Sequence, residues 1–206
     1  MGADGKTLLQ PLARPGDARF KNISGDNRLD SDDRTYIGNP NPDVIYGGNI
    51  ELGYKGFDFA LYFQGVAGND IWTGTKALLR QTSMTNLLAE TYTDAWRKAG
   101  DKTDVFGISR KDDNDNYRTS SWYVQDGSFL KIKSVQLGYT FPKKWIEATR
   151  VASSLRLYVS AENLFTITKF KYMDPEVPNG SALNMGMENL GYPNPRTFTV
   201  GVNVQF

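Results

Sequence analysis

The stretch Thr197-Phe-Thr-Val-Gly-Val-Asn-Val-Gln-Phe206 decides the fold class, because apolar and polar residues alternate along its whole length. Side chains two apart share a face of an extended chain, so this pattern predicts a β-strand with one apolar and one polar face. The apolar positions are Phe198, Val200, Val202, Val204 and Phe206.

Four further segments repeat this alternation upstream. Residues 44–54 and 57–67 flank a tight Lys55-Gly56 turn and predict a hairpin, and residues 134–141 and 155–162 each predict a strand. The five predicted strands are about ten residues long or longer, near the ~9–11 residues that a tilted membrane strand needs. Strands of soluble proteins average about 5–6 residues. We therefore expect an all-β chain that forms an antiparallel segment of a transmembrane β-barrel.

The connections between these strands alternate between short and long. Lys55-Gly56 and Pro142–Ser153 are short, whereas residues 68–127 and 167–194 are long. Outer-membrane barrels have short periplasmic turns and long extracellular loops, so the short connections are predicted to be periplasmic and the long ones extracellular. Leucine and aromatic residues recur at helical spacing from Leu78 to Arg97, which predicts short helices within the 78–97 loop.

The two faces of the predicted strands differ in a way that fits a barrel wall. A charge facing lipid near the midplane costs about 2–4 kcal/mol, so the polar face should line a hydrated or plugged lumen. Its members are Glu51, Asp58, Gln64, Arg156, Tyr158, Glu162, Asn203 and Gln205. Aromatic residues fall at the predicted periplasmic strand ends, as in an interfacial girdle. They are Tyr54, Phe57, Tyr139, Phe141, Trp145 and Phe206.

Composition narrows the function classes. The 206 residues include 24 Lys and Arg against 23 Asp and Glu, and this balance argues against nucleic acid as a partner. There is no cysteine, which excludes thiolate metal sites, disulfides and cysteine nucleophiles. There is no histidine either, so the commonest general base and transition-metal ligand is missing. We expect a protein that is not an enzyme.

The segment Asn22–Asp33 has the oxygen spacing of a calcium loop. Oxygen-bearing side chains occupy positions 1, 3, 5, 9 and 12 of the twelve-residue pattern, and Arg28 at position 7 would offer its backbone carbonyl. The candidate Ca²⁺ ligands are Asn22, Ser24, Asp26, Arg28, Asp30 and Asp33. The alternative is a solvated turn rich in Asp and Asn that holds its shape through side-chain hydrogen bonds without metal.

Three other features carry a functional and a structural interpretation. Asp174 and Glu176 could act as paired catalytic carboxylates, but neighbouring loop carboxylates are common. The run Asp112–Asn116 has no ligand spacing and is interpreted as a solvated loop tip. The tryptophans of the long interval could stack on sugars, although packing within a folded loop is favoured; they are Trp72, Trp96 and Trp122.

Several motifs together resemble the C-terminal region of SusC/RagA-type TonB-linked outer-membrane proteins, and they follow the family's order. They are Arg14–Asp17, Asn22–Arg34, Tyr36–Asp43, Tyr54–Asp58, Phe63–Gly65, Leu137–Pro142, Ala161–Phe165, Asp174–Glu176 and Tyr192–Phe198. The family usually has Asp first and Gly sixth in the calcium-loop-like segment, where this chain has Asn22 and Asn27.

The resemblance implies a plugged transporter of the 22-stranded class, to which this chain contributes its last five strands. It implies an outer-membrane location, lipid contact and a SusD-like surface lipoprotein as partner. Energy would come from TonB through N-terminal regions outside this chain, and the cargo would be an oligosaccharide or peptide, as in nutrient uptake and polysaccharide utilisation. The barrel remainder and the plug are expected from further residues, and the chain is not expected to transport alone.

The predicted organisation is an extracellular loop over residues 1–42, with the calcium-loop-like segment, followed by barrel strands over 43–206. The alternative function is a soluble secreted β-module that binds calcium and carbohydrate. A third hypothesis is an outer-membrane enzyme that uses Asp174 and Glu176.

Overall fold

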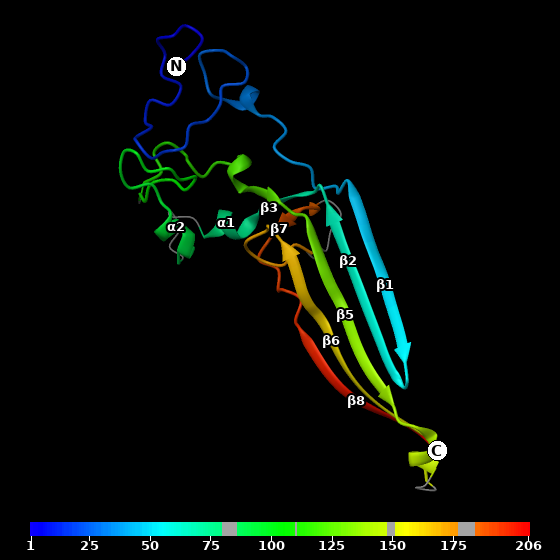
Figure 1. The fold of residues 1–206 in the computed structure, drawn as a ribbon. Coiled ribbons are helices and arrows are strands. Elements are labelled where there is room, and N and C mark those ends of the chain that lie inside the picture. The colour runs from blue at the N-terminus through cyan, green and yellow to red at the C-terminus, as the bar shows by residue number, and fades with distance from the viewer. Residues whose placement is uncertain (80–85, 110, 148–150, 177–183) are drawn as a thin grey trace. The chain divides into compact units, whose positions relative to one another are not determined.

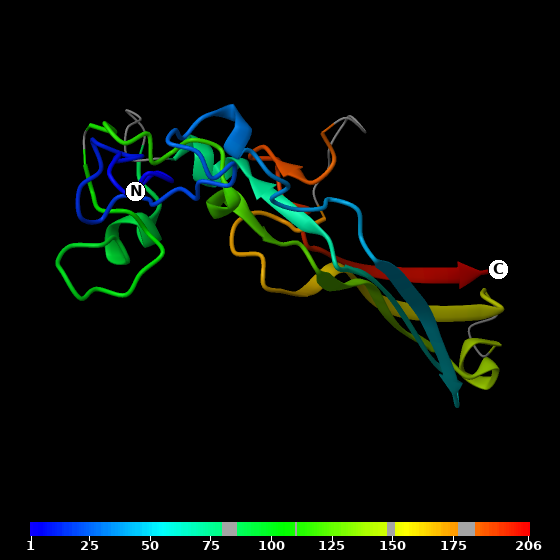
Figure 2. The same cartoon turned by 90° about the horizontal axis from the view of Figure 1, so that it is seen from above.

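In the computed structural model, residues 1–79, 86–109, 111–147, 151–176 and 184–206 are described. Their main element is a five-stranded antiparallel sheet with the order β1-β2-β5-β6-β8 (Figure 1). Its strands are β1 (Val44–Tyr54), β2 (Phe57–Ala67), β5 (Phe129–Thr140), β6 (Ser154–Thr168) and β8 (Thr197–Gln205). Seen from above, they run beside one another as long ribbons (Figure 2). The five predicted strands and their antiparallel arrangement are confirmed.

The remaining elements are short. The helices are η1 (Ser31–Asp33), α1 (Gly74–Leu78), α2 (Ala89–Thr93), η2 (Ser121–Tyr123) and α3 (Lys143–Glu147). A three-stranded sheet has the order β4-β3-β7 and consists of β3 (Asp70–Thr73), β4 (Val124–Asp126) and β7 (Met187–Glu188). Of the helices predicted within 78–97, α2 lies inside the range and α1 ends at its first residue, while residues 80–85 lie outside the described part.

The β1–β2 hairpin closes through the predicted two-residue turn. Lys55 and Gly56 both have positive φ, 48° and 88°, which are the dihedrals of a turn that matches the twist of the flanking strands. A side chain on Gly56 would lie 2.7 Å from the carbonyl oxygen of Thr140, so glycine is needed there for both conformation and space. This close approach joins the hairpin to the end of β5, where Thr140 N donates to Gly56 O.

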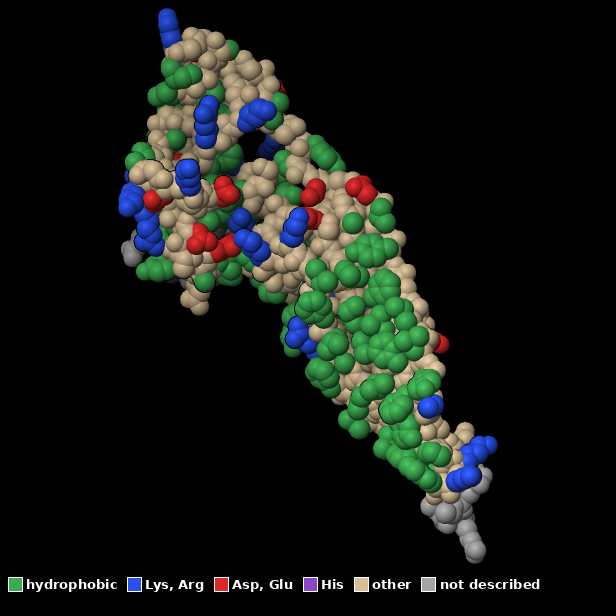
Figure 3. Space-filling view, in the orientation of Figure 1, with side chains coloured by type: hydrophobic (Ala, Val, Ile, Leu, Met, Phe, Trp, Pro, Cys, Tyr) green, Lys and Arg blue, Asp and Glu red, His purple; other side chains and the backbone are tan. Residues whose placement is uncertain are grey.

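The strand register sorts side chains onto two faces. One row across the sheet is apolar in all five strands: Leu52, Phe59, Leu137, Val159 and Val200. The adjacent row, on the opposite side of the sheet, runs Glu51, Ala60, Gln136, Ser160 and Thr199. In Figure 3 hydrophobic side chains cover one side of the sheet as a continuous patch. We call the two sides the apolar face and the polar face.

A β-bulge changes the register within the central strand. Tyr62 pairs with Ser134 but Phe63 pairs with Ile132, so Lys133 is the extra residue of β5. The alternation of apolar residues therefore shifts by one position, from Leu130 and Ile132 to Val135 and Leu137. This shift explains why the sequence pattern began the strand at residue 134, whereas β5 begins at Phe129.

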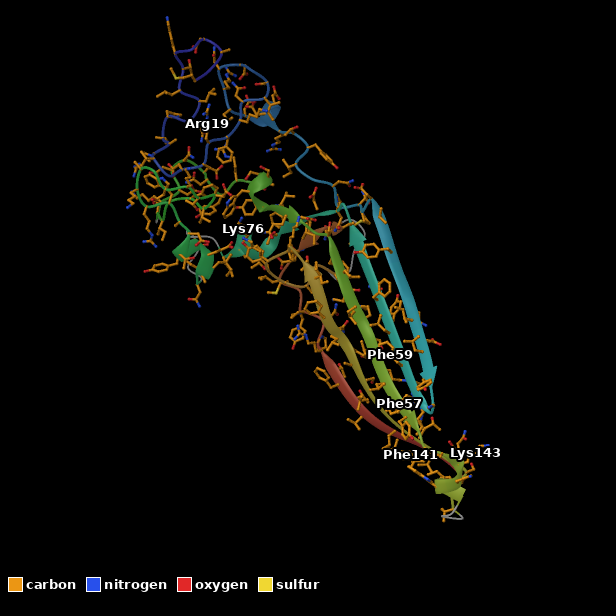
Figure 4. The ribbon with its side chains drawn as sticks, in the orientation of Figure 1. Arg19, Phe57, Phe59, Lys76, Phe141 and Lys143 are labelled. Atoms are coloured by element: carbon orange, nitrogen blue, oxygen red, sulfur yellow. The ribbon has the colours of Figure 1, made fainter. Side chains whose placement is uncertain are left out.

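Aromatic residues gather at the end of the sheet that holds the hairpin turn. The ring centroids of Phe57 and Tyr139 lie 4.5 Å apart, and those of Tyr139 and Phe141 lie 5.1 Å apart. Trp145 on α3 follows, 6.3 Å from Phe141. Figure 4 labels Phe57, Phe59 and Phe141 along this part of the sheet. The predicted grouping of aromatics at one level of the strands is thus present.

Contacts divide the chain into two compact units. One unit comprises Met1–Gly38 and Trp72–Val124, and the other comprises Asn39–Ile71 and Gln125–Phe206. The prediction divided the chain once, after residue 42, whereas each of these units combines two segments that are separate in the sequence. No helix among the described residues is long and apolar enough to cross a membrane.

The first unit is built from loops that bury polar amides and aromatic rings. Asn114 and Asn116 are 6% and 5% exposed, so the interpretation of Asp112–Asn116 as a solvated loop tip was wrong for these two residues, whereas Asp113 and Asp115 are exposed. Asn116 Nδ2 donates to Asp17 Oδ1 at 2.8 Å, and Gln10 Nε2 donates to Asn114 Oδ1 at 2.8 Å. Long-range partners, which local sequence does not reveal, therefore bury the two asparagines of this run.

The tryptophans of the first unit pack against its own residues. The Trp122 ring lies 4.7 Å from Phe106 and 5.0 Å from Tyr123, and Lys76 Nζ lies 3.7 Å above it. Trp96 covers Gly16, where an added side chain would clash with the indole. Both tryptophans thus pack within the unit, which is the role that the sequence analysis favoured over stacking on sugars.

Candidate functional site: the polar face of the sheet

The polar face carries a cluster of charges where β2 and β5 approach the long connections. Lys131 and Lys133, two residues apart on β5, lie near Gln64, which pairs with Lys131 across the strands. Lys131 is 1% exposed, an unusual position for a lysine that requires charge partners.

Two loop carboxylates supply those partners. Lys131 Nζ donates to Asp174 Oδ2 at 2.6 Å and to Glu176 Oε2 at 2.9 Å. Lys133 Nζ donates to both carboxylate oxygens of Glu176 at 2.9 Å. Gln64 and Asn194 complete the set, with Gln64 Nε2 donating to Glu176 Oε1 at 2.8 Å and Asn194 Nδ2 to Asp174 Oδ2 at 3.1 Å. These six residues form the lysine–carboxylate cluster.

The electrostatics of the cluster favour the ionised form of Glu176. Partial burial raises the pKa of Glu176, but the hydrogen bonds and charges of Lys131 and Lys133 outweigh it and hold that pKa below its usual value. The two lysines and two carboxylates cancel in formal charge. The arrangement therefore ties the connection after β6 to the polar face.

The same contacts bear on the hypothesis of paired catalytic carboxylates. A general acid needs a proton and a raised pKa, whereas Glu176 has a lowered pKa and two lysine donors. Asp174 and Glu176 are brought together with lysines, and their geometry is that of an ion-paired anchor. The sequence indicated the two carboxylates but not their lysine partners. Lys131 and Lys133 lie before residue 134, where the predicted strand began, so they were not assigned to a strand.

A second charge pair lies nearer the hairpin end of the polar face. Arg156 Nε donates to Asp58 Oδ1 at 2.9 Å, and its Nη2 donates to the other carboxylate oxygen. The pair spans β5 above Gly138, where an added side chain would lie 2.5 Å from both Asp58 and Arg156. A fork-shaped Arg–carboxylate pair fixes the positions of strands that are not direct neighbours.

The predicted calcium loop forms a ring closed by its last residue. Asp33 Oδ1 accepts from Ile23 N at 2.7 Å and Ser24 N at 3.0 Å, and Asp33 Oδ2 accepts from Asp30 N at 3.0 Å. The backbone hydrogen bond from Ser24 is the main cause of a lowered pKa at Asp33.

The other predicted ligands also bond within this loop. Asn22 Oδ1 accepts from Gly25 N, Asp26 Oδ1 from Arg28 N, and Asp30 Oδ1 from Asp32 N. Ser24 Oγ donates to Asn22 Oδ1 at 3.1 Å. Among the described residues, no group of three or more carboxylates converges as a metal site. The ring is thus held by its own hydrogen bonds, and calcium binding stays a prediction.

A sheet of long antiparallel strands with one apolar face and one charged polar face is the architecture of a β-barrel segment, and comparisons with known proteins give its relatives. No family model matches the chain. TonB-dependent receptor P3 of Formosa agariphila is 34% identical over 98% of the chain. TonB-dependent receptor SusC of Bacteroides thetaiotaomicron is 27% identical over 94% of it. The chain is therefore a homologue of the TonB-dependent receptors of the SusC type.

The matches concern only part of each relative. The chain spans about one fifth of the length of the curated relatives, 20% of receptor P3 and 18% of SusC. Among solved structures, the RagAB peptide importer in its closed-closed state matches 90% of the chain with a TM-score of 0.70 at 21% identity. A second structure of the RagAB peptide transporter gives a TM-score of 0.71 at 22% identity. At this identity the structural likeness shows the fold. The relatives are named as receptors and transporters, in agreement with the expectation of a protein that is not an enzyme.

Proposed function

We propose that this chain forms barrel strands of a TonB-dependent transporter in the outer membrane, which imports oligosaccharides or peptides. The observation that supports it best is the register of the five long strands, which separates a continuous apolar face from a polar face with paired charges. Lipid would contact the apolar face, since hydrocarbon tolerates apolar side chains and satisfied backbone groups. The polar face would line the lumen.

The proposal includes partners that complete the transporter. The open edges of β1 and β8 would pair with the rest of the barrel, and a plug would occupy the lumen. A SusD-like surface lipoprotein would cover the extracellular side, and TonB would deliver energy through regions outside this chain. The long connections would then face the cell exterior, and the Lys55-Gly56 turn the periplasm.

A matched pair of variants tests the lipid-facing assignment. Val159 and Ser160 are neighbours in β6 but belong to opposite faces. We expect Val159→Lys to destabilise the protein folded in phospholipid bilayers by about 2–4 kcal/mol, because the charge would enter hydrocarbon. Ser160→Lys should cost less, because its side chain would face water. Equal costs for the two variants would contradict the assignment.

Partitioning distinguishes the proposal from a soluble secreted β-module. We expect the folded protein to require detergent and to change its electrophoretic mobility on heating, as a barrel does when it unfolds. A monodisperse monomer of the whole chain without detergent would support the soluble module instead. The double variant Asp174→Asn with Glu176→Gln tests the enzymatic hypothesis, with cargo import and cargo hydrolysis both measured. We expect import to be retained. A hydrolytic activity of the parent protein that is lost in the variant would overturn our proposal.

A further inference from the structure

The N-terminal segment of the first unit lines a solvent-open cavity of about 720 Å³, and Arg19 and Lys21 are exposed at it. Its apolar lining includes Leu8, Leu9 and Phe20, and three basic residues, Arg14, Arg19 and Lys21, line it as well. Figure 4 labels Arg19 on the N-terminal trace. This volume falls within the ~300–1,000 Å³ of small-molecule sites, in which an apolar surface is combined with a few polar groups.

Buried amides fix the walls of this cavity. Gln10 Nε2 donates to Ala18 O at 2.9 Å, and Gln10 Oε1 accepts from Phe20 N at 2.9 Å. Asn114 Nδ2 donates to the same carbonyl of Ala18 at 3.0 Å, and Asn116 Oδ1 accepts from Ala18 N at 2.8 Å. The backbone from Ala18 to Phe20 is therefore held from two sides, so the cavity is formed before any ligand arrives.

The charges that line the cavity are unbalanced. Asp17 is the acidic member, and its carboxylate already accepts from Arg14 N and Asn116 Nδ2. Arg14 lies 3.3 Å from Asp113 in a solvent-exposed pair, which is a weak interaction. Within the described part of the chain, neither Arg19 nor Lys21 forms an ion pair.

We propose that this cavity, the anion pocket, binds the carboxylate or sulfate group of a small ligand such as an acidic sugar. Arg19 and Lys21 would supply the positive charges, and guanidinium and ammonium groups form short charge-assisted hydrogen bonds with such oxyanions. The apolar lining would contact the uncharged body of the ligand. The proposal is independent of the barrel function, because its residues all belong to the first unit.

Binding of three sugars to the whole chain in detergent tests the pocket, with saturation-transfer NMR or calorimetry as the measurement. Glucuronate carries a carboxylate, glucose 6-sulfate carries a sulfate, and glucose is the neutral match. We expect one or both acidic sugars to bind about tenfold more tightly than glucose, with affinity that falls as salt rises. The two acidic sugars show which oxyanion is preferred. Equal affinity for all three sugars would overturn the proposal.

Paired variants locate the site. Arg19→Gln with Lys21→Gln should remove the preference for acidic sugars, whereas Lys98→Gln with Lys102→Gln removes the same charge from two exposed residues of the same unit that do not line the pocket and should retain it. Arg19→Glu with Lys21→Glu should reverse the preference toward glucosamine, which is cationic. This reversal also shows that the variant protein is folded. Retention of the acidic-sugar preference in both Arg19/Lys21 variants would place binding elsewhere and contradict the proposal.

Discussion

Lys131 Nζ lies 2.6 Å from Asp174 Oδ2, and this contact joins the central strand of the sheet to a connection 43 residues further along the chain. The lysine side chain is 1% exposed and that of Asp174 is 11% exposed, so both charges have left bulk water. Removal of one partner of such a pair costs much more stability than the intact pair contributes, because the remaining charge stays buried without a partner.

We expect Lys131→Met to lower the free energy of unfolding by about 3 kcal/mol, since Asp174 would lose its lysine partner and Glu176 would keep only Lys133. Denaturant titration of the protein in detergent measures this change. Lys169→Met is the control, because Lys169 lies 3.9 Å from Asp126 and is 86% exposed. Its loss should change stability by less than about 1 kcal/mol. Equal effects would show that burial of Lys131 does not matter.

Acidification should release the connection that Glu176 anchors. The folded state lowers the pKa of Glu176 below its ordinary value of 4.5, so its stabilising contribution is complete above that value. It is lost as pH falls from 4.5 through the lower folded value. Hydrogen exchange of residues 170–176, corrected for the intrinsic effect of pH, should therefore accelerate over this range. Glu176→Gln should exchange fast throughout and show no such step; a step that persists in this variant would assign it to another group.

Two substitutions in the hairpin turn should affect stability differently. Gly56→Ala places a side chain at φ 88° and 2.7 Å from Thr140 O, so we expect a loss of about 1–3 kcal/mol. Lys55→Asn places a residue suited to positive φ at 48° and should be neutral or slightly stabilising. Denaturation midpoints measure both. A Gly56→Ala variant as stable as the parent would contradict the turn geometry.

The ring of residues 22–33 should depend on Asp33 whether or not it binds metal. Asp33→Ala removes the side-chain oxygen that accepts from Ile23 N and Ser24 N, and we expect both amides to lose protection from hydrogen exchange. Asp32→Ala is the matched control, because Asp32 contributes a backbone donor rather than a side-chain acceptor to the ring. Equal protection in the two variants would show that the carboxylate is not needed.

Calcium is tested separately on the same ring. If the predicted loop binds Ca²⁺, the melting temperature should rise on addition of CaCl₂ and fall on chelation, and Asp26→Ala should abolish this response. A melting temperature that does not change with calcium would contradict the prediction and leave a ring held by hydrogen bonds alone.

Local pattern was sufficient for the sheet where alternation was unbroken. The β1–β2 hairpin and β8 appear at the predicted residues, because a strand with one apolar and one polar face alternates apolar and polar residues along the sequence. The beginning of β5 was missed because the bulge at Lys133 shifts the alternation by one residue. The three-stranded sheet was missed as well, since β4 and β7 have only three and two residues, too few to show an alternation of apolar and polar residues.

The candidate site depended on information that sequence does not hold. Asp174 and Glu176 were visible as carboxylates, but their role follows from strand register, which brings Lys131 and Gln64 side by side. Asn114 and Asn116 looked solvated because local composition cannot report partners about one hundred residues away, at Asp17 and Gln10. A cluster of this kind becomes visible only when the register is known.

The sheet has two edges, since β1 and β8 each have one partner among the five strands. Each edge presents a row of unsatisfied amide and carbonyl groups, and any extended peptide with a matching hydrophobic period can pair with such a row. Pairing of two copies of this chain through such edges would be a second-order process, whose rate grows with the square of the concentration of unpaired chain. A low concentration of unpaired chain, rather than greater intrinsic stability, would be the effective protection during biogenesis.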